Sequence, residues 1–355
     1  MTKQDNAFGN DSKNSKNYAT KIKKTIETLS EADNIMVGST PKEIVTENRL
    51  YRLLHYPHIE KKIQTPLLIV YALINKSYIL DLQQDKSWIR NLAEQGFDVY
   101  LLDWKAPTNA DKYVSFNDYV NSYLDESVDL VLNQSSVDKI NLQGYCMGAT
   151  MSTMYASLYQ NKVKTLTTIS PVIDTANDTT VIGNIARHLD IDKIIDTLGN
   201  FPSEKLYECF SILKPFKQGI NKYINLIEHI DNDSFVQNFL RIEKWIYDTP
   251  PIAGETMRQW INDIYKNNLL FHNKMWLENR MLDLSQIKVP LLNIIAEEDH
   301  LVSPDCSAPL NKAVSSEDKQ LMRFNTGHVG LIASTYSQHN VLPKVGQWLK
   351  AYATC

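Results

Sequence analysis

Residues Asn141–Met151 read Asn-Leu-Gln-Gly-Tyr-Cys-Met-Gly-Ala-Thr-Met, and this stretch decides the fold. At its centre is a G-x-C-x-G pattern around Cys146. The segment before it, Val137–Leu142, alternates as a strand does, and Met147–Gln160 has the composition of a helix. The sequence therefore predicts a strand, a sharp turn at Cys146 and a helix, in that order.

This arrangement is the nucleophile elbow of the α/β-hydrolase fold, which usually carries Ser rather than Cys. The nucleophile there occupies a strained turn, and small neighbours such as Gly144 and Gly148 let strand and helix approach. The next amide, on Met147, would point at a developing oxyanion, at a helix N-terminus that also favours a thiolate. The alternative is a buried Cys between two turn glycines, and the pattern alone leaves both open.

Length and composition narrow the class of protein. The chain has 355 residues, 43% of them hydrophobic, which suits one large α/β domain with an insertion or two domains. A net charge of −4 gives no basic surface for a nucleic acid. The longest apolar run, Pro66–Ile74, is too short to span a membrane, and the polar start has no signal-peptide pattern. Four scattered cysteines without a C-x-x-C pair indicate no metal site, so we expect a cytoplasmic protein.

Strand and helix patterns alternate on both sides of the elbow. Pro66–Ala72 is a continuous apolar run, as in a strand buried on both faces, and Phe97–Trp104 and Val163–Ser170 are similar. Helical patterns over Ser87–Gln95 and Phe116–Leu132 separate them. This rhythm predicts an α/β-hydrolase fold with a mostly parallel central sheet flanked by helices.

The first 35 residues are polar, and we expect this segment to be partly disordered. Up to about Lys16 the composition is typical of disorder, whereas Tyr18–Leu29 has the pattern of a short amphipathic helix. The α/β core is expected to start at residue 36. Val45–Tyr56 alternates loosely and predicts one early antiparallel strand.

Between residues 174 and 283 the alternation of strand and helix patterns stops, and helical patterns dominate. The expected helices are Thr180–Gly199, Ser203–Leu213, Lys222–Ile230, Ser234–Tyr247 and Gly254–Asn267. An aromatic-rich helical insertion after the sixth strand is where α/β-hydrolases place a cap over the active site. We therefore assign 36–173 and 284–355 to the core and 174–283 to a cap. A helical subdomain without a role in substrate binding is the alternative.

The order of residues after the elbow predicts a catalytic triad. In this fold the nucleophile is followed by an acid and then by a His. Asp299 follows the strand Val289–Ala296, and His328 follows the strand Lys319–Phe324. Both lie in loops at the carboxyl edge of the sheet, where open α/β folds bind ligands. Cys146, Asp299 and His328 are thus the predicted triad.

Two roles in this site have more than one candidate residue. Glu297 or Glu298 could replace Asp299 as the acid, although Asp299 lies deeper in its loop. The second oxyanion donor, besides Met147, is a backbone N–H near Leu73 or Ile74, because the loop after the third strand supplies it in this fold.

The chemistry of the triad follows from its residue types. His328 would deprotonate Cys146, and Asp299 would hold the imidazole tautomer and support its charge. A thiolate suits thioester exchange, because attack and expulsion at sulfur are nearly isoenergetic. Cys in place of Ser therefore favours acyl transfer from a thioester over ester hydrolysis.

Seven stretches together resemble the catalytic subunit of polyhydroxyalkanoate synthases of the short two-component types, classes III and IV. They are Pro66–Leu82, Asp98–Trp104, Gly144–Gly148, Lys244–Asp248, Gly254–Asp263, Asp299–Val302 and Gly327–Gly330. The resemblance runs from about Thr40 to the C-terminus. One departure is Ala149, where many members have a second Gly.

The resemblance implies polymerisation of (R)-3-hydroxyacyl-CoA, usually 3-hydroxybutyryl-CoA, into a polyester with release of CoA. Cys146 would hold the growing chain and His328 would be its base. Asp299 would be the third member, which in some family proposals instead activates the hydroxyl of the incoming unit. No metal or other cofactor is implied. An accessory second subunit, which differs between class III and class IV, is implied, with a homodimer through the cap and a location at the surface of polyester granules.

Two other functions are compatible with the fold. A Cys-dependent thioesterase or esterase would use the same triad, and exclusion of water by an aromatic cap favours the polymerase over it. A non-catalytic binding protein of this fold would not need the three triad residues together.

Overall fold

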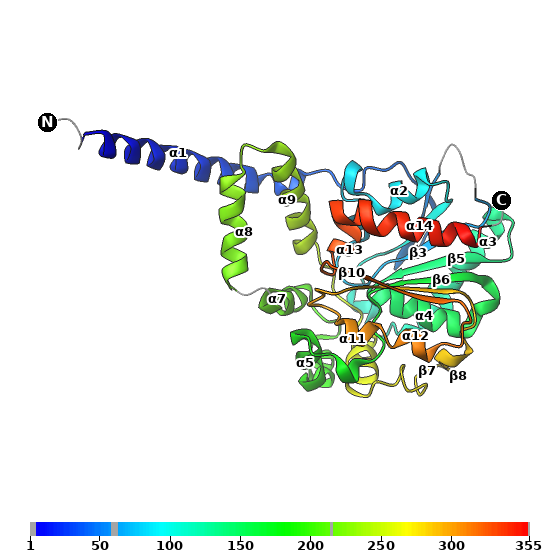
Figure 1. Cartoon of the computed structure of the whole chain (residues 1–355). Helices are drawn as coiled ribbons and strands as arrows, with labels where there is room; N and C mark the ends of the chain where they lie inside the picture. The colour runs from blue at the N-terminus through cyan, green and yellow to red at the C-terminus, as the bar shows by residue number, and fades with distance from the viewer. Residues whose placement is uncertain (1–4, 58–62, 214–215, 354–355) are drawn as a thin grey trace.

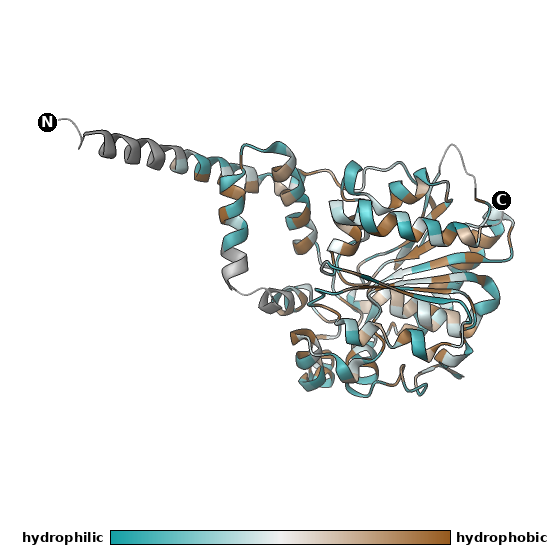
Figure 2. Ribbon diagram, in the orientation of Figure 1, coloured by the Kyte–Doolittle hydropathy of each residue, from teal (hydrophilic) through white to brown (hydrophobic). Residues whose placement is uncertain are grey.

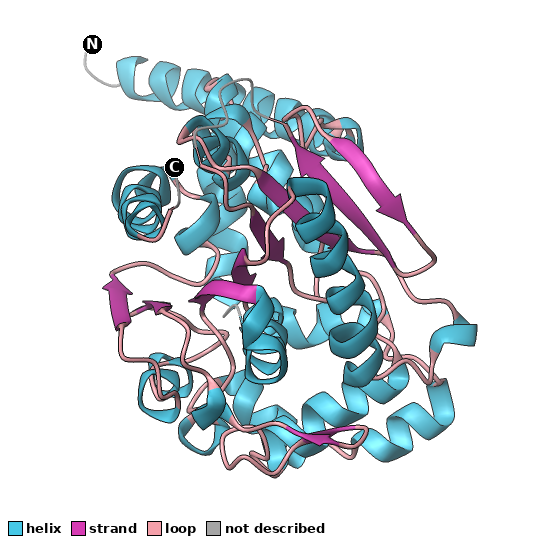
Figure 3. Cartoon of the chain, turned by 90° about the vertical axis from the view of Figure 1, so that its right-hand side faces the viewer, coloured by secondary structure: helices cyan, strands magenta, loops and turns pink. Residues whose placement is uncertain are grey.

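The computed structural model describes residues 5–57, 63–213 and 216–353. Within them, eight strands form one sheet in the order β1-β2-β4-β3-β5-β6-β9-β10. Figure 3 shows the strands in magenta among the surrounding helices. Their bounds are β1 Glu43–Glu47, β2 Tyr51–Tyr56, β3 Leu67–Val70, β4 Val99–Trp104, β5 Ile140–Tyr145, β6 Val163–Ile169, β9 Leu291–Ala296 and β10 Lys319–Phe324. β2 is antiparallel to β1 and β4, and the neighbours from β4 to β10 are parallel. The predicted fold class is confirmed.

Helices cover both faces of this sheet. α2 and α14 lie together on one face, and α4 and α12 lie on the other (Figure 1). Figure 2 shows hydrophobic residues along the strands they cover. β3, β4, β5 and β9 are buried at every position, and the sequences of β3, β4 and β9 are accordingly nearly continuous apolar runs. The helices of the core are α2 Trp88–Glu94, α3 Asp125–Ser135, α4 Met147–Tyr159, α11 Pro304–Ser307, α12 Leu310–Ala313, α13 Gly330–Ala333 and α14 Leu342–Ala351.

Short helical turns complete the connections between these elements. They are η1 Ala32–Asn34, η2 Ser77–Leu80, η3 Gln84–Lys86, η4 Asn109–Asp111, η5 Asp118–Leu124, η6 Gln160–Lys162, η7 Thr175–Asn177, η9 Leu284–Gln286 and η10 Ser337–Val341. η2 follows β3 and η7 follows β6, so both lie at the carboxyl edge of the sheet.

The prediction of one early antiparallel strand over Val45–Tyr56 is wrong in one respect, because the structure has two strands in this part of the chain. β1 and β2 form a hairpin, and the chain turns at Asn48. The Asn48 side chain accepts hydrogen bonds from the amides of Leu50 and Tyr51, at 2.8 and 3.0 Å. Such local capping of backbone amides ends a strand and starts a turn.

The short amphipathic helix expected over Tyr18–Leu29 lies within a longer helix of the N-terminal segment. This helix, α1 Asp5–Ser30, runs through the segment and projects from the body (Figure 1). Its end is anchored on the cap, where Lys24 Nζ lies 3.0 Å from Asp231 and Leu29 packs against a buried cluster that consists of Leu226, Ile230, Val236 and Leu240. Once one end of a helix is held, each further turn forms at little additional free-energy cost. The amino-acid composition of the segment does not reveal such a contact.

The region assigned to the cap contains helices, as expected, and a small hairpin that was not expected. Its elements are α5 Val181–His188, α6 Ile191–Leu198, α7 Ser203–Leu213, α8 Phe216–Glu228, α9 Asp233–Tyr247, α10 Gly254–Gln259, η8 Trp260–Lys266, β7 Trp276–Leu277 and β8 Arg280–Met281. The single helix expected over Thr180–Gly199 is two helices. Asp190 caps the second one by accepting a hydrogen bond from the amide of Lys193.

Candidate active site

Cys146 forms the turn between β5 and α4. Its backbone has φ 55° and ψ −124°, a conformation that non-glycine residues rarely adopt and that costs on the order of 1–3 kcal/mol. Hydrogen bonds fix this turn, because the Cys146 amide donates to the Ile169 carbonyl at 2.8 Å and its carbonyl accepts from Ala149 and Thr150. The strained elbow predicted from the sequence is therefore present.

Two glycines allow this turn to close. A Cβ atom on Gly144 would lie 2.4 Å from the Cα of Ala149, and one on Gly148 would lie 2.2 Å from the Val70 carbonyl oxygen. Both distances are shorter than side chains tolerate, so strand and helix approach only because these residues are glycine. Ala149 itself is completely buried, and the fold accommodates its methyl group.

The structure brings Cys146, Asp299 and His328 together. His328, after β10, has its Nδ1 atom 2.7 Å from Oδ2 of Asp299, after β9, and the Cys146 side chain lies near enough to the imidazole to act on the pKa of His328. Asp299 and His328 are buried, whereas Cys146 is partly exposed. Burial lowers the pKa of His328, but the negative charges of Asp299 and Cys146 outweigh it and raise the pKa to about 10. The surroundings of His328 thus favour its protonated, imidazolium form.

Asp299 is held as a carboxylate with all its acceptor positions used. Oδ1 accepts hydrogen bonds from the amides of Leu301 and Val302, both at 2.9 Å, and Oδ2 accepts from Ser170 at 3.0 Å and faces His328. Burial raises its pKa, but the charge of His328 and these hydrogen bonds lower it further, so the net pKa lies below the ordinary value.

The alternative acids do not reach the site. Glu297 and Glu298 are both exposed, and Glu297 forms an ion pair with Arg323 at 3.1 Å. His300 is exposed as well. Among these neighbours only Asp299 is buried.

Three tyrosines beside the triad were missed by the sequence reasoning. Tyr145 places its ring centroid 5.0 Å from that of His328 and stacks on Tyr71 at 5.8 Å. Tyr265, on η8, is the third. Burial, followed by nearby negative charges that include Cys146, raises the pKa of each of the three well above its ordinary value. The position of Tyr145 directly before Cys146 was the one available signal.

The cap contacts the loop that follows β3. The indole N–H of Trp245, in α9, donates to the Lys76 carbonyl at 2.8 Å. The Asn75 side chain donates to the Trp245 carbonyl at 3.1 Å and to Oγ1 of Thr249 at 2.7 Å. Leu73 and Ile74 lie directly before these residues, so the position of the predicted oxyanion donors depends on the cap.

Among the described residues, no group of three His, Cys, Asp or Glu side chains is placed to hold a metal ion. No helix in the described part of the chain combines the length and the apolar character needed to cross a bilayer.

Comparison with known proteins places this site in a family. The alpha/beta hydrolase fold model matches residues 65–334, and the model of the N-terminus of poly-beta-hydroxybutyrate polymerase (PhaC) matches residues 12–92. The poly(3-hydroxyalkanoate) polymerase subunit PhaC of Allochromatium vinosum is 40% identical over 335 residues, 94% of each chain. The chain belongs to the poly(3-hydroxyalkanoate) polymerase PhaC family.

Other members of this polymerase family are similarly close. The subunit PhaC of Haloferax mediterranei is 42% identical over 91% of this chain, which spans 65% of that longer relative. The subunit PhaC of Synechocystis is 38% identical over 89% of this chain and 86% of its own length. The predicted polymerase function and acyltransferase class are confirmed at the level of this family.

Solved structures support the fold of the polymerase. The monoacylglycerol lipase of Paleococcus ferrophilus has a TM-score of 0.53 at 16% identity, covering 86% of this chain and all of the lipase. A soluble variant of monoglyceride lipase from Saccharomyces cerevisiae has a TM-score of 0.54 at 14% identity, covering 90% of this chain and 97% of its own. At such identities the likeness concerns the fold alone.

Proposed function

We propose that Cys146 carries the growing polyester chain as a thioester and exchanges it with incoming (R)-3-hydroxyacyl-CoA. The observation that carries this proposal is the placement of Cys146, on the strained turn before α4, near the buried His328–Asp299 pair. A thiolate that is paired with an imidazolium is both a nucleophile and a leaving group at neutral pH. Chain transfer needs both properties in turn.

The first step loads an acyl group. The Cys146 thiolate attacks the thioester carbonyl of the substrate, and a bond from carbon to the Cys146 sulfur forms. The bond from carbon to the CoA sulfur breaks, and CoA leaves with the proton of the His328 imidazolium. The imidazole is then neutral and can act as a base.

The second step extends the chain. The 3-hydroxyl oxygen of the next hydroxyacyl-CoA attacks the thioester on Cys146 and gives its proton to His328. The bond to Cys146 breaks, the thiolate–imidazolium pair returns, and the extended chain is briefly an ester of the incoming CoA thioester. Cys146 then attacks that thioester, recovers the chain and releases CoA.

For Asp299 we favour the orienting role over direct activation of the substrate hydroxyl. A carboxylate has about four acceptor positions, and those of Asp299 are engaged by Leu301, Val302, Ser170 and His328. Its lowered pKa also makes it a weak base. It is therefore suited to hold the His328 tautomer and support its charge.

The oxyanion of each step is assigned to backbone amides. Met147 is the first residue of α4, and amides at a helix N-terminus lack intrahelical partners. The loop that begins after Val70 passes beside it, because the Tyr71 carbonyl lies against Gly148. These placements support Met147 with Leu73 or Ile74 as the donors.

The substrate, partners and location follow the family. The short substrate 3-hydroxybutyryl-CoA agrees with the match to the N-terminus of poly-beta-hydroxybutyrate polymerase, and several relatives are named as subunits. We accordingly propose an accessory second subunit, a homodimer through the cap, a location in the cytoplasm at polyester granules and no cofactor beyond the CoA of the substrate. Exposed apolar side chains on the cap, Val181, Leu198 and Tyr247, support an interface there.

The test is incubation of the purified protein with (R)-3-hydroxybutyryl-CoA, following CoA release, polymer and protein mass together. Release of CoA with polymer and an acyl adduct, all absent in Cys146→Ala, is the expected result. Cys306→Ala is the matched control, because Cys306 is completely buried and burial raises its pKa. CoA release with only free hydroxy acid would identify a thioesterase instead. No adduct on Cys146 would contradict the proposed role of this residue.

A further inference from the structure

The side chain of Tyr145 contacts His328 at two places. Tyr145 is the last residue of β5 and directly precedes Cys146. Its ring centroid lies 5.0 Å from that of the His328 imidazole, with an angle of 42° between the two planes. Its hydroxyl group donates a hydrogen bond to the backbone carbonyl oxygen of His328 at 3.4 Å, 183 positions further along the chain. One side chain therefore touches both the imidazole and the backbone of His328.

The carbonyl group of His328 is bypassed by the helix that follows it. At the start of α13, backbone amides donate to the carbonyls of Gly327 and Val329, the residues on either side of His328. The carbonyl of His328 instead accepts from Tyr145. A buried carbonyl group without a donor is costly, so the hydroxyl group of Tyr145 stabilises this one position of the loop.

Tyr145 itself has little freedom to move. Its backbone belongs to a central strand and pairs with Ile169 of β6, and the residue is only 2% exposed. Its ring also stacks on that of Tyr71, which follows β3, with centroids 5.8 Å apart and planes 25° apart. A buried ring on a central strand, packed against a second ring, is a rigid support for a residue in a loop.

The groups that face His328 come from three parts of the sheet edge. Asp299, after β9, lies 2.7 Å from Nδ1 of the imidazole, and Cys146 and Tyr145 stand at the end of β5. Burial, followed by nearby negative charges, raises the pKa of Tyr145 well above the ordinary value, so its hydroxyl group stays neutral. Tyr145 thus adds no charge beside the imidazole and acts on it by packing and by the hydrogen bond alone.

We propose that Tyr145 is a positioning residue for the triad, which holds the His328 imidazole in the place where it exchanges a proton with Cys146. The inference rests on the proposed function and deepens it. Asp299 engages Nδ1 of the imidazole, the hydroxyl group of Tyr145 holds the backbone of the same residue, and the ring of Tyr145 limits rotation of the imidazole. The other ring nitrogen of His328 is then left for the thiol group. Tyr145 neither bonds to the substrate nor gives up its proton.

The test is the pH dependence of alkylation of Cys146 by iodoacetamide, followed by protein mass. The alkylation rate reports the thiolate fraction of Cys146, which depends on the imidazole beside it. Tyr145→Phe removes the hydrogen bond and keeps the ring, whereas Tyr145→Leu removes both. We expect the midpoint of the profile to rise by about 0.3 pH unit in Tyr145→Phe and by about 0.5 to 1 unit in Tyr145→Leu.

Tyr155→Leu is the matched control for the loss of a buried tyrosine. Tyr155 donates to Asp125 at 2.7 Å and stacks on Tyr159, and it lies about 13 Å along α4 from Cys146. We expect a lower Tm in this variant and an unchanged midpoint, because a merely structural loss does not alter the pairing of Cys146 with His328.

The outcomes separate the inference from the proposed function. An unchanged midpoint in every Tyr145 variant that folds would overturn the inference, as would an equal rise in Tyr155→Leu. Tyr145→Phe keeps the ring, so its profile decides the matter if Tyr145→Leu does not fold. Alkylation needs no substrate, whereas absence of an acyl adduct on Cys146 of the unmodified protein after (R)-3-hydroxybutyryl-CoA would overturn the proposed function itself.

Discussion

Trp245, in cap helix α9, donates its indole N–H to the carbonyl oxygen of Lys76, in the loop after β3, across 2.8 Å. These residues are 169 positions apart in the chain. The same loop precedes η2 and begins beside the N-terminus of α4, so the cap and the proposed oxyanion hole share one segment. Displacement of α9 would therefore alter the backbone that is proposed to stabilise the oxyanion.

Substitution of Asn75 tests this connection. Asn75 has φ 59°, which glycine adopts freely, so Asn75→Gly removes two hydrogen bonds to the cap without backbone strain. We expect faster amide hydrogen exchange in α9 and a larger share of hydrolysis among the products. Asn273→Gly is the control, because Asn273 also has a positive φ, 56°, and lies away from this loop. Unchanged hydrogen exchange in α9 would show that the hydrogen bonds of Asn75 do not hold the cap.

Asp299→Asn should abolish most of the activity without removing the nucleophile. The amide can present its N–H₂ to His328 and stabilise the wrong tautomer, and a comparable change in a Ser-His-Asp enzyme costs about 10⁴-fold in kcat. We expect CoA release to slow by a factor on the order of 10³–10⁴, and alkylation of Cys146 by iodoacetamide near pH 7 to slow as well. Labelling at the original rate would mean that Asp299 does not support the charged pair.

The stability conferred by the His328–Asp299 pair should depend on pH in a defined window. The raised pKa of His328 stabilises the fold fully below its ordinary value of 6.5 and less as the pH rises to about 10. The lowered pKa of Asp299 contributes above its ordinary value of 3.8 and is lost as the pH falls. The contribution of the His328–Asp299 pair to the free energy of unfolding is therefore largest between pH 3.8 and pH 6.5.

Urea unfolding of the protein and of Asp299→Asn at several pH values measures this contribution. Loss of one partner of a buried ion pair costs on the order of 3 kcal/mol, so the difference in unfolding free energy should reach that size near pH 5. It should shrink steadily toward pH 10. A difference that grows with pH above 6.5 would contradict the assigned charges.

Gly148→Ala should be strongly destabilising. The new methyl carbon would lie 2.2 Å from the Val70 carbonyl oxygen, and backbone atoms cannot yield as a side chain can. We expect Tm to fall by several degrees and activity to be lost, because the elbow must open. Gly327→Ala is the control, since its methyl carbon would lie 3.5 Å from the Glu298 carbonyl oxygen, an ordinary contact. Equal Tm values for the two variants would show that close approach is not why position 148 is glycine.

The sequence by itself determined the elbow and the order of the triad. Glycines on both sides of Cys146 and strand patterns before Asp299 and His328 are local features, and the carboxyl ends of parallel strands meet at one edge of a sheet. The choice of Asp299 over Glu297 also followed from its place in the loop. Periodicity and turn chemistry act over a few residues, so they can be read without the fold.

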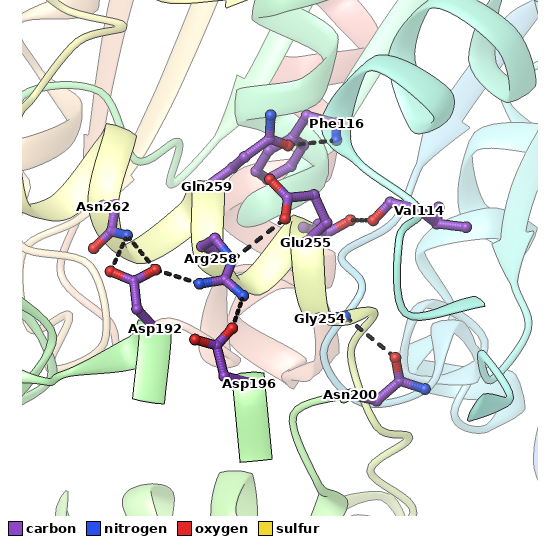
Figure 4. Close-up of polar contacts among 11 residues, drawn as sticks. Val114, Phe116, Asp192, Asp196, Asn200, Gly254, Glu255, Arg258, Gln259 and Asn262 are labelled. Carbon is purple, nitrogen blue, oxygen red and sulfur yellow. Dashed lines mark hydrogen bonds and ion pairs between the residues drawn. The ribbon is translucent and has the colours of Figure 1, made fainter. Parts of the chain in front are cut away.

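Only the tertiary structure decided the surroundings of these residues. The helical N-terminal segment depends on contacts with α8, and the break within Val45–Tyr56 depends on the side chain of Asn48. The positions of α10 and η8 depend on contacts with distant segments, such as those of Arg258 with Asp196 and of Gln259 with Phe116 (Figure 4). Contacts between segments more than a hundred residues apart are set by the packing of whole elements, and no local pattern in the sequence encodes them.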